Sequence, residues 1–280
     1  MMDFTEFVSI IGEQVKTELG KDIRLEKVNK IGQSYTGLVV ETGEGVAWPC
    51  FNMDAFYEDY LNNQKLDEVM QEIKKTCLEK KSIGFELLDD YSKAKHNLYV
   101  RLSGAEKVPA NVPFRSIADM AMTCHVMLGN AGDEYLASVT VNNDLLGKWG
   151  VTKEDLFREA LETSARLNPP ALMALSDFME LPGDTDMIIL SSKTGRFGAS
   201  VICYPGVLDS VATEMDGDYY LLPSSVHEMI VLPVTEDGDT SGLWAMVKDV
   251  NHSNVIRADD VLTDSVYRYY AADKQLLLAF

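Results

Sequence analysis

The sequence predicts an α+β fold, in which mixed or mainly antiparallel sheets pack against amphipathic helices. Helical and strand-like stretches follow one another without the regular spacing of β-α-β units, which favours α+β over a doubly wound parallel sheet. Hydrophobic residues make up 46 % of the 280 residues and charged residues 25 %, a balance typical of globular proteins. A chain of this length can bury a core without disulfides or metal ions.

Apolar periodicity predicts the helices. From Phe4 to Leu19, apolar side chains recur every three or four residues and so share one helix face. Thr152, three residues before Asp155, caps the clearest helix, and Pro169-Pro170 stops it because proline cannot continue the hydrogen-bond ladder. The predicted helices span residues 3–19, 53–61, 66–81, 153–167, 205–215 and 241–250.

Apolar runs between turn-forming residues predict the strands. Residues 129–132 suit a hairpin connection, and Gly195 suits a turn between two further strands. The predicted strands span residues 23–28, 35–41, 98–102, 119–128, 135–141, 187–190, 199–203, 219–222, 226–232, 265–270 and 274–278.

Residues 103–113 are the best position for a boundary, because they contain a glycine and two prolines with few apolar residues. We therefore expect an N-terminal portion of residues 1–105 and a C-terminal portion of residues 112–280, or else one continuous domain.

The net charge of −19 is the unusual feature of the composition. Residues 1–150 carry a net charge of −7 and residues 151–280 a net charge of −12, so the acidic excess is spread along the chain. Direct binding of nucleic acid would need a basic stripe, which the sequence lacks. The acidic surface either keeps the protein in solution, or repels or imitates nucleic acid and so occupies a basic groove.

The sequence favours a cytoplasmic protein. No basic segment followed by an apolar one begins the chain, and no apolar run approaches the roughly 18 residues of a membrane helix. The cysteines Cys50, Cys77, Cys124 and Cys203 form no C-x-x-C pair, so we expect free thiols and no thiolate zinc site.

The motifs of the common cofactor and metal sites are missing, so we expect no cofactor and no metal. There is no phosphate-binding glycine loop and no G-x-S-x-G turn. His227-Glu228 begins like a zinc-protease motif, but Val231 stands where the second histidine is needed. Cys124 and His125 are adjacent in a predicted strand and so point to opposite faces, which favours a packing role.

Two places remain as candidates for chemistry. Cys203 is predicted to end a strand just before a helix, where peptide N–H groups could lower a thiol pKa. In a strand, Ser225 and His227 would share one face and Glu228 would point to the other, so a catalytic triad would need an acid from elsewhere. The alternative is that Pro223, Ser224 and Ser225 form a turn, and that a hydrogen bond of His227 connects this turn to the next strand.

Several segments, in order along the chain, resemble an uncharacterised domain family of gut Gram-positive bacteria, often found among mobile-element genes. The signature segments are Leu222–Glu228 and Leu262–Tyr269, and Tyr35–Leu38, Asn52–Tyr60, Leu146–Gly150 and Tyr204–Leu208 match as well. The resemblance implies a shared fold and supplies no catalytic residues. Because Ser224, Ser225, His227 and Glu228 fall in a signature segment, the resemblance makes them candidate binding residues.

Two classes of function follow from these observations. The leading hypothesis is a non-enzymatic binding or accessory protein of a bacterium or its mobile elements, in particular an acidic inhibitor of a nucleic-acid-binding protein. An immunity or antitoxin partner is a variant of the same class. The rival class is an enzyme, a hydrolase that uses Ser225 and His227. The sequence identifies neither the partner protein nor the oligomeric state.

Overall fold

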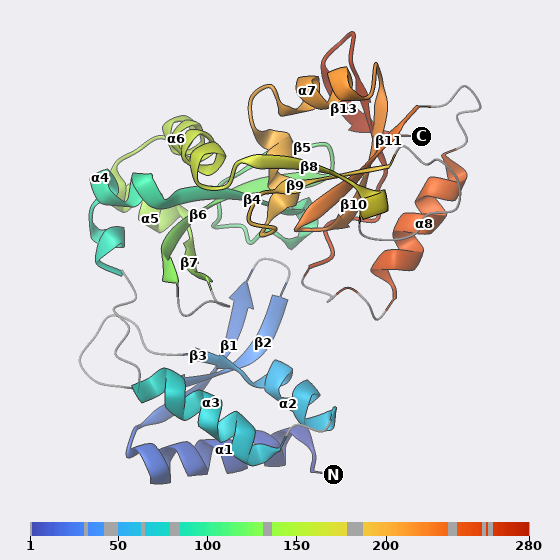
Figure 1. Cartoon of the computed structure of the whole chain (residues 1–280). Coiled ribbons are helices and arrows are strands. Elements are labelled where there is room, and N and C mark those ends of the chain that lie inside the picture. Colours follow the sequence, from blue (N-terminus) through green and yellow to red (C-terminus); the bar gives the residue numbers. More distant parts are fainter. Residues whose placement is uncertain are drawn as a thin grey trace. The chain divides into compact units, whose positions relative to one another are not determined.

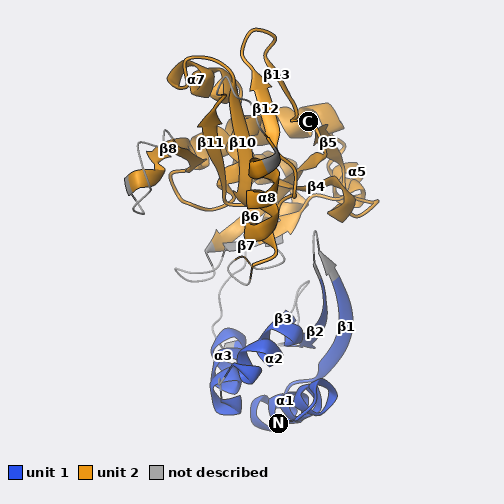
Figure 2. Ribbon diagram, turned by 90° about the vertical axis from the view of Figure 1, so that its right-hand side faces the viewer, with its two compact units in different colours: residues 1–85 blue, residues 86–280 orange. Residues whose placement is uncertain are grey.

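A computed structural model of the chain describes residues 2–30, 33–41, 50–62, 65–78, 85–130, 136–177, 187–234, 240–253, 256 and 260–279 (Figure 1). The chain divides into two compact units, residues 1–85 and 86–280 (Figure 2). The sequence pattern places the boundary later, between residues 105 and 112. The units divide earlier because the strand Leu98–Gly104 is paired along its whole length with a strand of the second unit.

Unit 1 packs helices on a small antiparallel sheet with the strand order β1-β2-β3. The strands are β1 (Ile23–Lys30), β2 (Gln33–Val40) and β3 (Cys50–Asn52), and the helices are α1 (Phe4–Leu19), α2 (Met53–Leu61) and α3 (Leu66–Leu78). The predicted helices and the two longer strands are confirmed, while residues 79–81 of the third predicted helix lie outside the described residues. The core is formed by Phe7, Val8, Ile11, Val15, Leu38, Val40, Phe51, Met53, Phe56, Val69, Met70 and Ile73.

The first sheet of unit 2 is organised around one long strand. This strand, β6 (Met120–Asn130), pairs with β4 (Leu98–Gly104) along one edge, and with β5 (Phe114–Ile117) and β7 (Leu136–Thr140) along the other. Helix α6 (Lys153–Leu167) begins at the predicted Thr152 cap and packs on β4. Helix α5 (Asn143–Trp149), the short helix α4 (Tyr91–Ala94) and strand β5 were not predicted from the sequence.

The second sheet of unit 2 is antiparallel and has the strand order β13-β12-β10-β11-β9-β8. Its strands are β8 (Pro170–Ala174), β9 (Ile188–Ser192), β10 (Tyr219–Ser225), β11 (Glu228–Pro233), β12 (Tyr267–Tyr270) and β13 (Gln275–Leu278). Helix α8 (Ser241–Asn251) covers β10 through Val247, and α7 (Val207–Glu214) precedes β10 in the chain (Figure 1). The α+β prediction with mainly antiparallel sheets is therefore confirmed.

Two local predictions in this unit are wrong. Residues 199–203 were predicted as a strand but belong to a 3-10 helix, Gly198–Cys203, because Phe197 turns the chain with a φ of 50° and its carbonyl accepts from Ser200 Oγ. The strand predicted from Val226 begins two residues later, at Glu228. Strand β8 was missed because it starts at Pro170, which is tolerated as the first residue of an edge strand.

Within the described ranges, no helix has the length and apolar character needed to cross a membrane.

Candidate functional site

The turn between β10 and β11 contains the residues that the sequence singles out. Pro223 pairs with Met229 and Ser225 pairs with Glu228, with a register shift between Pro223 and Ser225. Ser225 therefore ends one strand, and Val226 and His227 form the turn. The expectation that Ser225 and His227 share one face of a continuous strand is wrong, because the chain reverses between them.

The serine side chains of this turn are hydrogen-bonded within it. Ser225 Oγ accepts from the backbone N–H of His227 at 3.0 Å. Ser224 Oγ donates to Glu228 Oε1 at 3.0 Å, across the start of β11. Serine oxygens commonly close turns in this way. The arrangement stabilises the reversal of the chain and uses the Ser225 oxygen as an acceptor from the backbone.

The His227 ring is held from both sides. The backbone N–H of Phe197 donates to Nδ1 at 3.0 Å, so the neutral ring carries its proton on Nε2. Nε2 lies 3.4 Å from Asp260 Oδ1, and the ring stacks on Phe197 with a centroid distance of 5.4 Å. A base for Ser225 would need a free ring nitrogen directed at the serine oxygen. Here Nδ1 serves a backbone donor and Nε2 faces a carboxylate.

Phe197 extends this contact toward the first sheet of unit 2. The guanidinium carbon of Arg101 lies 3.7 Å from the Phe197 ring centroid, a cation–π contact, and Tyr99 stacks on the same ring with a centroid distance of 6.0 Å. Tyr99 and Arg101 belong to β4, whereas His227 lies in the turn between β10 and β11 of the second sheet. Phe197 and His227 thus join the two sheets.

The backbone of the turn is fixed as firmly as its side chains. Ser191 Oγ of β9 donates to the His227 carbonyl at 2.8 Å, and the Val226 N–H donates to the Asp260 carbonyl at 2.8 Å. Gly198 packs so closely that a Cβ atom would collide with the His227 carbonyl oxygen and would lie 2.5 Å from the Ser192 nitrogen. Sequence reasoning missed Phe197, Gly198 and Asp260. The glycines Gly195 and Gly198 on either side of Phe197 were the available signal.

Cys203 and His125, which were considered for chemistry on the basis of the sequence, lie in packed surroundings. Burial raises the pKa of the Cys203 thiol, the opposite of the lowered pKa that a reactive thiolate requires. His125 is buried between Thr123 Oγ1 at 3.0 Å and Thr140 Oγ1 at 3.3 Å, and burial lowers its pKa. Cys124 beside it is buried, and burial raises its thiol pKa. These contacts favour the packing role.

Acidic turns in the described parts of the chain bind the chain's own groups. Asp218 accepts from the Ala271 N–H at 2.9 Å and from Arg268 at 2.7 Å. The acidic loop at residues 236–239 lies outside the described residues. Among the residues that the structure describes, no three or more histidine, cysteine, aspartate or glutamate side chains are grouped so as to hold a metal ion.

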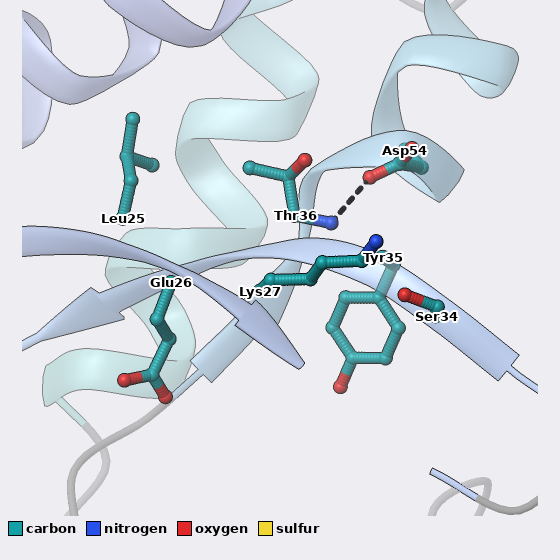
Figure 3. Close-up of a pocket in the computed structure, with 7 residues that line it drawn as sticks. All are labelled: Leu25, Glu26, Lys27, Ser34, Tyr35, Thr36 and Asp54. Atoms are coloured by element: carbon teal, nitrogen blue, oxygen red, sulfur yellow. Dashed lines mark hydrogen bonds between the residues drawn. The ribbon is translucent and has the colours of Figure 1, made fainter. Parts of the chain in front are cut away.

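A groove of about 640 Å³ lies in unit 1, beside the β1–β2 hairpin (Figure 3). Asp54, in the first turn of α2, forms one wall, and its Oδ2 accepts from the backbone N–H of Thr36 at 2.6 Å. The lining residues are Leu25, Glu26, Lys27, Ser34, Tyr35, Thr36 and Asp54. Sequence reasoning did not select this place, although the two segments it brings together, Tyr35–Leu38 and Asn52–Tyr60, belong to the resemblance described above.

The model of a protein family of unknown function, DUF5688, matches residues 4–271, and so spans both compact units. No curated protein and no solved structure matches the chain.

Proposed function

The chain belongs to DUF5688, a family of unknown function, and we propose that it is a non-enzymatic binding protein of a bacterium or its mobile elements. In the form that the charge supports best, it occupies the basic surface of a nucleic-acid-binding protein and inhibits it. The four cysteines are free thiols, which agrees with the reducing cytoplasm as its compartment.

The observation that supports this proposal is how the positive charges are used. Residues 86–280 carry 29 acidic and 15 basic side chains, a net charge of −14. Nine of the basic side chains are engaged with carboxylates, carbonyl oxygens or aromatic rings of the same chain. They are Arg101, Lys107, Arg115, Lys148, Lys153, Arg158, Arg166, Arg268 and Lys274. These cations make contacts within the chain, and the net charge of −14 makes the field toward solvent negative.

The hydrogen bonds of the β10–β11 turn support binding over hydrolysis. A serine hydrolase needs the serine hydroxyl to donate to the imidazole of its base. Ser225 Oγ instead accepts from the His227 backbone, while Phe197 occupies Nδ1 of the His227 ring. Ser224, Ser225, His227 and Glu228 therefore stabilise a half-buried turn, and any contact with a partner would use the part of each side chain that is exposed.

The test is capture of the partner by the full-length chain from a native lysate, at about 0.05 M and about 0.5 M salt, between which the Debye length shortens severalfold. The proposal predicts a stoichiometric basic protein that is retained at low salt and lost at high salt, and whose bound nucleic acid the chain displaces. A partner whose affinity is unchanged by salt would contradict the acidic-inhibitor form. An immunity or antitoxin role would show itself as a toxin among the captured proteins.

The rival function has its own test. If the purified chain shows a hydrolytic activity, Ser225→Ala must abolish it while Ser224→Ala, which changes the neighbouring serine, leaves it. Activity that survives in the folded Ser225→Ala variant would remove Ser225 from the chemistry.

A further inference from the structure

Strand β2 is only partly covered on the side of β3. It pairs with β1 along its whole length, but with β3 only from Gly37 to Val39. At Asn52 the chain leaves the sheet, and α2 begins at Met53. In the part of unit 1 that the structure describes, no strand borders residues 33–36 of β2 on this side.

The register determines where the backbone groups of this segment point. In an antiparallel ladder, hydrogen-bonded pairs alternate with pairs that direct their N–H and C=O groups outward. The Glu41 N–H donates to the Asp22 carbonyl, which places Glu26–Gly37 among the bonded pairs. Lys27–Thr36 and Asn29–Ser34 are therefore outward pairs. Thr36 and Ser34 direct their N–H and C=O groups away from β1, toward the uncovered side.

The contact of Asp54 agrees with this register. The outward N–H of Thr36 donates to Asp54 Oδ2 at 2.6 Å (Figure 3). Three outward backbone groups are then left: the Thr36 carbonyl, the Ser34 N–H and the Ser34 carbonyl. They are one donor and two acceptors, placed as a neighbouring strand would need them. The structure gives these three groups no partner among the described residues.

The groove places apolar and charged side chains beside this open edge, where they could contact a peptide. Residues opposite one another share a face of the sheet, so Leu25, Lys27, Ser34 and Thr36 lie on the face that carries the buried Leu38. Leu25 is 53 % exposed, so the core no longer covers the face at this point. Glu26 lies on the opposite face and its Oε2 is 3.4 Å from Arg24 Nε, so the charged groups beside the open edge are the Asp54 carboxylate and the Lys27 ammonium group.

We propose that this groove binds an extended, basic peptide segment, which pairs with Ser34 and Thr36 and so adds a strand to β2. The donor and acceptors that have no partner among the described residues fit the backbone of a strand, as in other cases of strand addition. The Asp54 carboxylate at the open edge and the net charge of −19 favour basic side chains. The inference rests on the proposed function, since the segment belongs to the basic partner protein, and it names the site where that partner is held.

The test uses a displayed library of short random peptides, selected on the full-length chain, with the recovered peptides measured by fluorescence anisotropy. We expect sequences in which lysine or arginine alternates with β-branched residues. Ser34→Pro removes the outward N–H without removing a bond to β1, and should weaken binding about tenfold, as for the loss of one hydrogen bond. Asn29→Pro is the matched control, because Asn29 lies opposite Ser34 and directs its N–H to the other edge of the hairpin.

A second measurement does not depend on how the proline variants fold. In the parent protein, the recovered peptide should slow amide hydrogen exchange at Ser34. Asp54→Asn keeps an acceptor for the Thr36 N–H and removes the charge, so it should weaken binding about threefold at low salt and less at high salt.

Three results would overturn the inference: no peptide enriched on the parent over Ser34→Pro, equal affinity for the two, or unchanged exchange at Ser34. The proposed function is judged separately by the salt-sensitive capture experiment. A captured basic protein that binds Ser34→Pro as tightly as the parent would preserve the proposed function and place its contact outside the groove. Recovered peptides that bind as inferred, with no basic protein captured from the lysate, would preserve the groove and contradict the inhibitor.

Discussion

Replacing Gly198 with alanine is expected to destabilise the second unit by about 2–4 kcal/mol. The new Cβ would meet Ser191 Oγ, the His227 carbonyl oxygen and the Ser192 nitrogen, the last at 2.5 Å. Two of these three atoms belong to the backbone and cannot rotate away. Gly12 offers a contrast, since a Cβ there would meet the flexible end of the Ile23 side chain at 2.8 Å.

The magnitude has two parts. Overpacking of a filled site typically costs about 1–3 kcal/mol. The hydrogen bond from Ser191 Oγ to the His227 carbonyl must also lengthen, which adds about 1 kcal/mol. For a unit of this size, a loss of about 3 kcal/mol lowers the melting temperature by roughly 6–12 °C. Scanning calorimetry of the parent and the variant measures this shift directly.

Gly147→Ala is the matched control for this measurement. Gly147 lies within α5, and a Cβ there meets nothing within 4 Å. The same substitution should therefore leave stability unchanged or raise it by up to about 1 kcal/mol. If Gly198→Ala and Gly147→Ala melt at the same temperature, the close approach between the 3-10 helix and the β10–β11 turn is not a constraint on the fold, and the reasoning fails.

Three further predictions concern single groups. Cys50 is exposed, whereas Cys203 is only partly exposed and burial raises the pKa of its thiol, so a thiol reagent should modify Cys50 of the native protein much faster than Cys203. Equal rates for the two, measured by peptide mapping, would contradict this. Tyr267→Phe removes the hydroxyl that donates to Asp119 Oδ1 and should lower the free energy of unfolding, measured in urea, by roughly 1.5–3 kcal/mol. A loss below about 0.5 kcal/mol would show that this hydrogen bond does not stabilise the fold. The Ala271 N–H and Arg268 lower the pKa of the Asp218 carboxyl, so its contribution is present above the unfolded pKa of about 4 and is lost as pH falls through the folded value; Asp218→Asn should lower the unfolding midpoint at neutral pH, and the two midpoints should converge in acid.

The helices of eight or more residues were predictable because their signals are local, whereas the shorter α4 and α5 were not predicted. The cap at Thr152 is confirmed by its acceptance of the Asp155 N–H at 3.1 Å, and the apolar face of α6 is buried through Leu156, Phe157 and Ala160. Periodicity and capping need only the neighbouring residues, so a single sequence displays them. The α+β class followed from the order of such elements.

The details of the β10–β11 turn depend on residues far away in the sequence, and this is why they were not predicted. The sequence singled out Ser224, Ser225, His227 and Glu228, but the pairing of Ser225 with Glu228 places His227 in the turn and not in a strand. The tautomer of His227 then depends on the Phe197 N–H, thirty residues away. No periodicity in either segment reports this contact.

The groove escaped prediction for a related reason. Each of its residues is ordinary in its own strand or helix turn. Its open edge exists because β3 pairs with β2 only as far as Gly37 and the chain then enters α2. Where a strand stops relative to its neighbour is a property of the assembled sheet.

The strand order of the second sheet of unit 2 has a consequence for synthesis on the ribosome. Strand β12 lies between β10 and β13. The edge of β10 that pairs with β12 therefore stays unpaired until residues 267–270 have been synthesised, more than forty residues after β10 itself. Unit 1 joins strands and helices that are all close in sequence, and such local contacts form fast. We expect unit 1 to be folded while β10 still exposes an unpaired edge, and a ribosome-bound chaperone would be needed longest during that interval.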